Sequence, residues 1–182
     1  MARPLITVYG SSSVHEGEAA YNLALDLGRD LAHAGAAVMT GGYGGVMEAC
    51  SRGAAEVGGH VIGVTVETYA ARGPANPWVT ERRHAPDLFE RLRMLVTGAD
   101  GLVAVGGSLG TLNEVFLAWT LVAAHARPAA PLVLLGEEWA PVLEALHHAA
   151  FLTREQLALV QMASDAATAA RFALASSTTL NA

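Results

Sequence analysis

The 182-residue chain has a formal net charge of −6 at pH 7, and 52% of its residues are hydrophobic. An acidic balance without clustered positive charge argues against a broad nucleic-acid surface, and no apolar run reaches the roughly 18 residues of a membrane span. The chain contains arginine but no lysine, which excludes a phosphate-binding P-loop and Schiff-base chemistry, and the single cysteine, Cys50, excludes an internal disulfide.

Strand-like and helix-like segments alternate along the chain. In chain order, the patterns predict a strand at 5–10, a helix at 18–34, a strand at 36–40, a helix at 46–57, a strand at 60–65, an irregular segment at 66–84, a helix at 87–97, a strand at 101–105, a long helix at 110–126, a strand at 131–136, a helix at 138–149, a weaker strand at 157–163 and a helix from 165.

This alternation predicts an α/β fold with a Rossmann-like, doubly wound parallel sheet of about six to seven strands and helices on both faces. The chain shows no linker or internal repeat, so we expect a single domain over residues 1–176 and a frayed tail over 177–182. In such sheets ligands bind beyond the carboxyl ends of the strands.

Three turns rich in glycine or serine follow predicted strands: "GSSS" at 10–13, "GGYGG" at 41–45 and "GGSLGT" at 106–111. Glycine lets backbone N–H groups wrap an anion, and a following helix adds the positive end of its dipole. These turns favour a small phosphate ligand, although tight turns without a ligand would look similar. The first turn is not the Gly-x-Gly-x-x-Gly of dinucleotide-binding enzymes, which argues against a nicotinamide-dependent dehydrogenase.

Two charged positions near these turns admit more than one role. Glu114 follows Thr111 by three residues, a spacing that suits a capping box, a carboxylate stabilised near a helix N-terminus, or a catalytic acid. Arg91 and Arg93 are two residues apart on a predicted helix, so at most one of them can face a site. A guanidinium there would grip phosphate bidentately.

Two longer segments, "GGYGGVMEACSRGAAEVGGHVIGVT" (41–65) and "FERLRMLVTGADGLVAVGGSLGTLNE" (89–114), resemble the Lonely Guy (LOG) family of Rossmann-like proteins, long misannotated as lysine decarboxylases. The resemblance covers about residues 4–136. The family signature Pro-Gly-Gly-x-Gly-Thr-x-x-Glu occurs here over 106–114 with an intact Gly-Thr-x-x-Glu half. Gly106 replaces the proline, Ser108 replaces the second glycine, and Leu92 stands where the family usually has lysine.

Family members active on cytokinin precursors hydrolyse the N-glycosidic bond of nucleoside 5′-monophosphates to the free base and ribose 5-phosphate. The resemblance therefore implies a ligand such as AMP, with Glu114 and Arg91 as catalytic residues. The nucleotide-binding residues that it implies are Gly10, Ser11, Ser12, Gly41, Gly42, Gly44, Gly45, Met47, Gly106, Gly107, Ser108, Leu109, Gly110 and Thr111.

The family also contains nucleotide-binding and molybdenum-cofactor-carrying relatives, so the alternative is a non-catalytic carrier with the same phosphate turns. A third possibility is a scaffold that acts through protein contacts, because the helix at 110–126 is apolar almost all round.

Members of the family are typically dimers in which this helix joins the interface, so the resemblance implies a homodimer. We expect a cytoplasmic protein without metal or cofactor, and Trp78 is either a base-stacking residue or an ordinary surface residue.

Overall fold

The computed structural model describes residues 3–126 and 130–175. Its strands are β1 (Leu5–Gly10), β2 (Ala37–Thr40), β3 (Val61–Val66), β4 (Glu81–Ala85), β5 (Gly101–Val105), β6 (Leu132–Leu135) and β7 (Gln161–Ala163). All of them pair in parallel in one sheet of order β4-β3-β2-β1-β5-β6-β7. The predicted doubly wound α/β fold is confirmed, with seven strands.

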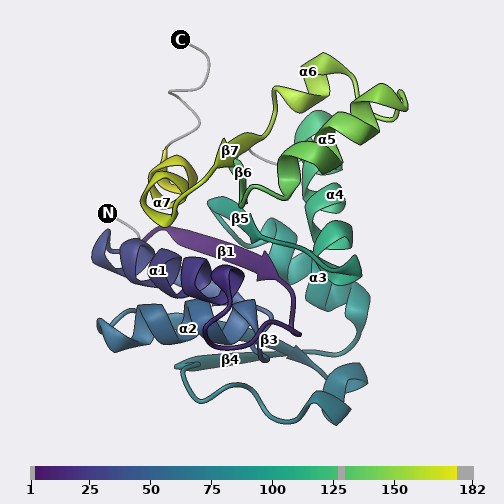
Figure 1. Ribbon diagram of the computed structural model, residues 1–182. Helices are drawn as coiled ribbons and strands as arrows, with labels where there is room; N and C mark the ends of the chain where they lie inside the picture. The colour runs from purple at the N-terminus through teal and green to yellow at the C-terminus, as the bar shows by residue number, and fades with distance from the viewer. Residues whose placement is uncertain (1–2, 127–129, 176–182) are drawn as a thin grey trace.

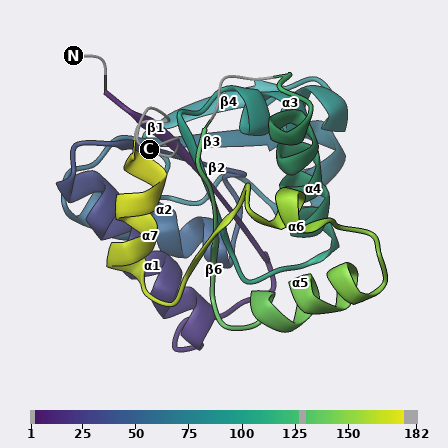
Figure 2. The same ribbon diagram turned by 90° about the horizontal axis from the view of Figure 1, so that it is seen from above.

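Helices cover both faces of this sheet (Figures 1 and 2). They are α1 (Ala19–His33), α2 (Val46–Glu56), the 3₁₀ helix η1 (Glu67–Arg72), α3 (Leu88–Thr97), α4 (Leu109–Ala123), α5 (Trp139–His148), the short α6 (Arg154–Leu157) and α7 (Ala166–Leu174). Helices α1, α2 and α7 lie on one face, and α3, α4 and α5 lie on the other. None of these helices is long and apolar enough to cross a membrane.

The two helix layers enclose two hydrophobic cores, one on each side of the sheet. Strands β3, β5 and β6 are buried along their whole length, which explains why Thr65 is the one polar residue among them. Helices α1 and α2 approach closely because Gly28 and Gly53 have no side chain, and a Cβ at Gly53 would overlap the backbone of α1. Cys50 lies in this layer, and burial raises the pKa of its thiol to about 12, so it is no candidate nucleophile.

The order of the strands fixes where a ligand can bind. From β1 the chain moves outward through β2 and β3 to β4, then returns to place β5 against the other side of β1. Gly10 at the end of β1 is in register with Val105 at the end of β5, so the loops that follow these strands start side by side. A crevice forms where the winding direction reverses, beyond the carboxyl ends of the strands.

The structure differs from the sequence-based prediction in two segments. The span 66–84, expected to be irregular, contains η1 and most of the fourth strand, β4. Towards the C-terminus, the strand expected at 157–163 is only β7, at 161–163, and a short helix, α6, precedes it. The expected domain end at residue 176 and the tail at 177–182 lie outside the described residues and stay predictions.

Candidate functional site

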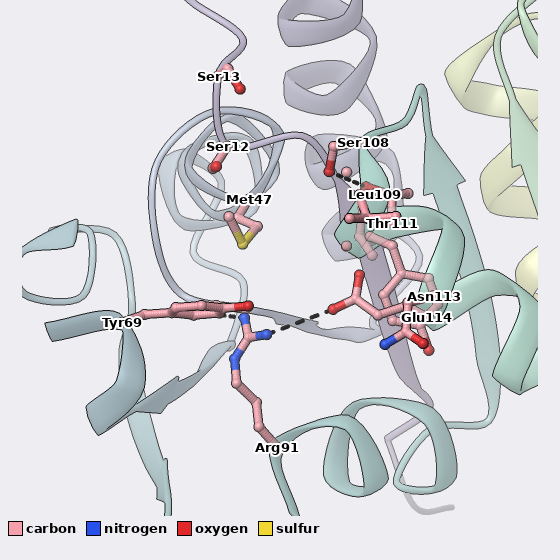
Figure 3. A pocket seen from close by; sticks show the side chains of 15 residues that line it. Ser12, Ser13, Met47, Tyr69, Arg91, Ser108, Leu109, Thr111, Asn113 and Glu114 are labelled. Atoms are coloured by element: carbon pink, nitrogen blue, oxygen red, sulfur yellow. Dashed lines mark hydrogen bonds and ion pairs between the residues drawn. The ribbon is translucent and has the colours of Figure 1, made fainter. Parts of the chain in front are cut away.

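A pocket of about 640 Å³ lies at the switch point between β1 and β5 (Figure 3). This volume is typical of a small-molecule site. The lining residues come from the end of β1, from the loops after β1, β2 and β5, and from α2, η1, α3 and α4. They are Val8, Tyr9, Gly10, Ser12, Ser13, Gly41, Met47, Tyr69, Arg91, Ser108, Leu109, Gly110, Thr111, Asn113 and Glu114.

The turn after β5 presents the N-terminus of α4 to this pocket. Ser108 is the N-cap residue, with extended backbone angles and no side-chain capping hydrogen bond. Its hydroxyl lies instead 3.2 Å from that of Thr111. The first N–H groups of a helix have no partner within the helix, so those of Leu109, Gly110 and Thr111 are available donors for an anion.

The position of Glu114 in α4 argues against both structural roles considered for it, the capping box and the stabilised carboxylate near the helix N-terminus. Because the helix begins at Leu109, Thr111 is already inside it and cannot be the N-cap residue of a Thr-x-x-Glu capping box. Glu114 lies in the second turn, where the dipole of the helix N-terminus has largely faded. Its carboxylate points into the pocket (Figure 3), and neither structural role explains it.

Arg91 reaches the pocket from α3 and is buried. Its Nε donates to the carbonyl oxygen of Val64 at 2.9 Å, and its Nη2 donates to that of Gly41 at 3.2 Å. The guanidinium also lies over the rings of Tyr43 and Tyr69, 5.8 and 5.5 Å from their centroids. These contacts hold the guanidinium against backbone and aromatic groups, which disfavours the bidentate phosphate grip expected from the sequence.

The third nitrogen of the guanidinium faces Glu114. Nη1 of Arg91 lies 3.7 Å from Oε1 of Glu114, and the two side chains are only 9% and 14% exposed. A pair of this length is an ion pair without a short, charge-assisted hydrogen bond. In a partly buried site the attraction is stronger than in water, so Arg91 orients an anionic carboxylate towards the pocket.

The turn after β2 packs against the Arg91 guanidinium of this pair. Gly41 borders both Arg91 and Met47, and a Cβ at this position would overlap Nη2 of the guanidinium. Gly45 has a φ of 68°, and a Cβ there would overlap the carbonyl oxygen of Ser11. That same oxygen accepts a hydrogen bond of 2.9 Å from the backbone N–H of Val46. The loop after β1 is thereby fixed to the start of α2.

The structure brings many of the expected residues together. Those that line the pocket are Gly10, Ser12, Gly41, Met47, Arg91, Ser108, Leu109, Gly110, Thr111 and Glu114. The expected residues that do not line it are Ser11, Gly42, Gly44, Gly45, Gly106 and Gly107. Most of these shape the turns instead. Sequence reasoning missed Val8, Tyr9, Ser13, Tyr69 and Asn113, of which Ser13 belonged to a turn already singled out.

The structure accounts for two of the three departures from the family pattern, Gly106 and Leu92. Gly106 has a φ of 57°, which a proline ring cannot adopt, and a Cβ there would come within 2.9 Å of a carboxylate oxygen of Glu138. Leu92 packs against the core on the α4 side of the sheet, so no charge enters the pocket there. Arg93 pairs with Glu90 on the surface and Arg83 pairs with Glu81, so neither replaces the missing lysine.

Two further sequence expectations concern residues away from the pocket. Trp78 is not a lining residue, and the guanidinium of Arg52 lies over its ring at 5.8 Å. The aromatic residue that the loop after β3 contributes is Tyr69. Within residues 3–126 and 130–175, no three His, Cys, Asp or Glu side chains gather as metal ligands would.

Comparisons with known proteins show which family and which relatives this chain is similar to. Residues 3–124 match the model of the SLOG cluster4 family. The chain is 30% identical over 158 residues to a cytokinin riboside 5′-monophosphate phosphoribohydrolase of Rhodococcoides fascians, covering 82% of this chain and 78% of the relative. It is 32% identical to a pyrimidine/purine nucleotide 5′-monophosphate nucleosidase of Escherichia coli K12, covering 72% of this chain but only 31% of that enzyme.

Solved structures point to a second kind of relative. The fold matches the molybdenum cofactor binding protein of Rippkaea orientalis with a TM-score of 0.73 and 26% identity, over 91% of this chain and 92% of that one. It matches the molybdenum cofactor carrier protein of Chlamydomonas reinhardtii with a TM-score of 0.69 and 29% identity, over 93% and 95%.

Proposed function

The chain belongs to the SLOG cluster4 family, which confirms its resemblance to LOG proteins, and we propose that it hydrolyses the N-glycosidic bond of a nucleoside 5′-monophosphate such as AMP. Curated relatives at about 30% identity act on nucleotide 5′-monophosphates, which supports a hydrolase of this kind. The observation that carries the proposal is the Glu114 carboxylate, aimed into the pocket a little over one helical turn from the anion-binding end of α4.

In this proposal the 5′-phosphate binds at the α4 N-terminus. The N–H groups of residues 109–111 and the hydroxyls of Ser12, Ser13 and Ser108 supply neutral donors. The anchored phosphate positions the ribose so that C1′ comes close to Glu114. Binding energy from the non-reacting phosphate thus orients the bond that breaks.

The carboxylate of Glu114 then stabilises the positive charge that develops on the sugar. As the C1′–N bond breaks, the bonding electron pair leaves with the base, and the ribose acquires oxocarbenium character that a carboxylate stabilises. Water adds to C1′, a proton is lost from that water, and the departing base takes up a proton. Glu114 can orient the water and accept its proton.

Arg91 is a positioning residue in this proposal. Two of its nitrogens are held by backbone carbonyls, and the third faces the carboxylate. Its fixed guanidinium sets where the carboxylate of Glu114 lies. The phosphate is bound by the N-terminus of α4 and not by Arg91.

The decisive experiment compares two equivalent substitutions. Glu114→Gln keeps the shape of the side chain and removes its charge, so we expect release of adenine from AMP to fall by about 100-fold or more. Glu144→Gln, at an exposed position of α5, should leave release at the wild-type rate. Free base is followed by chromatography. No release by the wild-type protein, or equal release by Glu114→Gln, would contradict the proposal.

The second candidate is a carrier that holds a molybdenum cofactor or nucleotide without turnover. The near full-length matches to molybdenum cofactor proteins favour it. The neutral donors at the α4 N-terminus would suit the phosphate of either ligand. Thermal-shift measurements separate the two candidates: a carrier is stabilised by its ligand and leaves AMP intact, whereas an enzyme consumes AMP.

The homodimer and the cytoplasmic location stay predictions. The dimer prediction concerns α4, whose Phe116, Leu117 and Leu121 are half-buried against the core of the chain itself. Leu109, at the start of the same helix, is 85% exposed at the mouth of the pocket.

A further inference from the structure

The pocket has two chemically different ends. Figure 3 shows the hydroxyls of Ser12, Ser13 and Ser108 towards one end, whereas Tyr69 and Arg91 lie towards the other. Glu114 enters from the side opposite to Tyr69. A nucleotide whose phosphate occupies the hydroxyl end, with C1′ beside Glu114, therefore directs its base towards Tyr69.

Tyr69 is held in place as a wall of the pocket. The hydroxyl of Tyr43 donates to the carbonyl oxygen of Val66 at 3.1 Å and accepts from its N–H at 3.0 Å, which fixes the point where η1 leaves β3. The ring of Tyr69 then packs edge-on against that of Tyr43, with 6.0 Å between centroids. The Arg91 guanidinium also lies over the ring of Tyr69, 5.5 Å from its centroid. A ring supported in this way is preorganised for a flat ligand.

The surroundings of this ring suit the face of a base better than its edge. Met47 contributes a thioether, and Gly41 contributes no side chain. Arg91 directs two nitrogens to backbone carbonyls and a third to Glu114, which leaves it poorly placed to read the edge of a base. Stacking on an aromatic ring tolerates different bases, because every base has a π face.

We propose that Tyr69 is the platform on which the base stacks, with Met47 as the adjoining apolar wall, so that the site selects ligands by ring area more than by exocyclic groups. The inference rests on the proposed function for the identity of the ligand. AMP, GMP and N6-substituted AMP should then have similar KM values, and the smaller rings of CMP and UMP should give higher ones.

The test uses Tyr69→Ala, with Tyr69→Phe as the conservative variant. Loss of a stacked ring should raise KM for AMP by about 10- to 100-fold with little change in kcat, because the contact is equal in the ground and transition states. Tyr69→Phe, which keeps the ring, should restore the wild-type KM. Ribose 5-phosphate has no base, so its inhibition constant should be the same for all three proteins.

Two results would overturn the inference. If Tyr69→Ala lowers kcat and leaves KM unchanged, Tyr69 acts through Arg91. If AMP and ribose 5-phosphate weaken equally, Tyr69 supports the whole pocket and no particular part of the ligand. Calorimetry with the Glu114→Gln protein keeps this test apart from the proposed function: even without turnover, AMP binding should depend on Tyr69 and ribose 5-phosphate binding should not.

Discussion

The turn after β2, residues 41–45, and the turn after β5, residues 106–110, are both rich in glycine, but their surroundings differ. In the first turn, added methyl groups at Gly41 and Gly45 would overlap Arg91 and Ser11. In the second, the nearest heavy atoms to a methyl group at Gly107 or Gly110 are 3.9 Å away. The first turn is filled by protein, and much of the second is open.

The difference shows what a glycine-rich turn does and does not indicate. Glycines of the first turn allow one part of the protein to approach another: the loop after β1 at Gly45 and the guanidinium at Gly41. In the second turn, Gly110 lines the pocket within the first turn of α4, whose first N–H groups have no partner inside the helix. Both patterns suggested phosphate binding from the sequence. At the start of α2, the N–H of Val46 already donates to Ser11, whereas three successive residues at the start of α4 line the pocket.

The largest expected effect is on stability, at Gly45. Gly45→Ala forces a β-carbon onto a left-handed φ of 68° and against the carbonyl of Ser11, so we expect a loss of about 3 kcal/mol in the free energy of unfolding. Gly107→Ala is the control in the open turn and should change stability by less than about 0.5 kcal/mol. Urea denaturation measures both. Equal losses would show that the two turns are packed alike.

The next effect, at Gly41, is on turnover. Gly41→Ala displaces the Arg91 guanidinium, and with it the partner of Glu114, so we expect release of base to fall by about 100-fold. Gly44→Ala lies in the same turn, where the nearest atoms are 3.8 Å away, and should retain activity. Steady-state kinetics decides between them. Full activity in Gly41→Ala would mean that the position of the guanidinium is not critical.

The smallest effect is expected at Gly110, where substitution should change stability and ligand affinity in opposite directions. This residue lies in the first turn of α4, where alanine is favoured over glycine, so Gly110→Ala should stabilise the fold by up to about 1 kcal/mol. The added methyl group enters the pocket, and affinity for ribose 5-phosphate should fall about 10-fold. Thermal melts and calorimetry give the two values. Unchanged affinity would place the phosphate elsewhere.

Most of the fold could be predicted from the sequence because its inner strands are predominantly apolar runs. The runs at 61–66 and 101–105 are buried along their whole length, and each is followed by a clear break. The fourth strand was missed because "ERRHA" is an edge strand with alternating exposure. It therefore lacks the apolar run that marks a strand buried on both faces. Four residues of α6 were too few for a helical period to appear.

The site was predicted less completely, because its geometry depends on residues far apart in sequence. Glu114 and Arg91 could be singled out from a motif, yet their 3.7 Å contact depends on the packing of α3 against α4. Tyr69 gave no signal, since it stands alone in a segment that looked irregular and its neighbours in space are Tyr43 and Arg91. Trp78 was considered as a base-stacking residue only because it is a tryptophan, and it does not line the pocket.

The charged edge strand has a consequence for behaviour in solution. β4 pairs with β3 on one side, and its other edge ends the sheet with Glu81, Arg82 and Arg83 along a five-residue strand. A strand from another molecule that added to this edge would have to bury these charges or place its own beside them. The residues that concealed β4 from sequence analysis therefore protect the sheet from edge-to-edge aggregation.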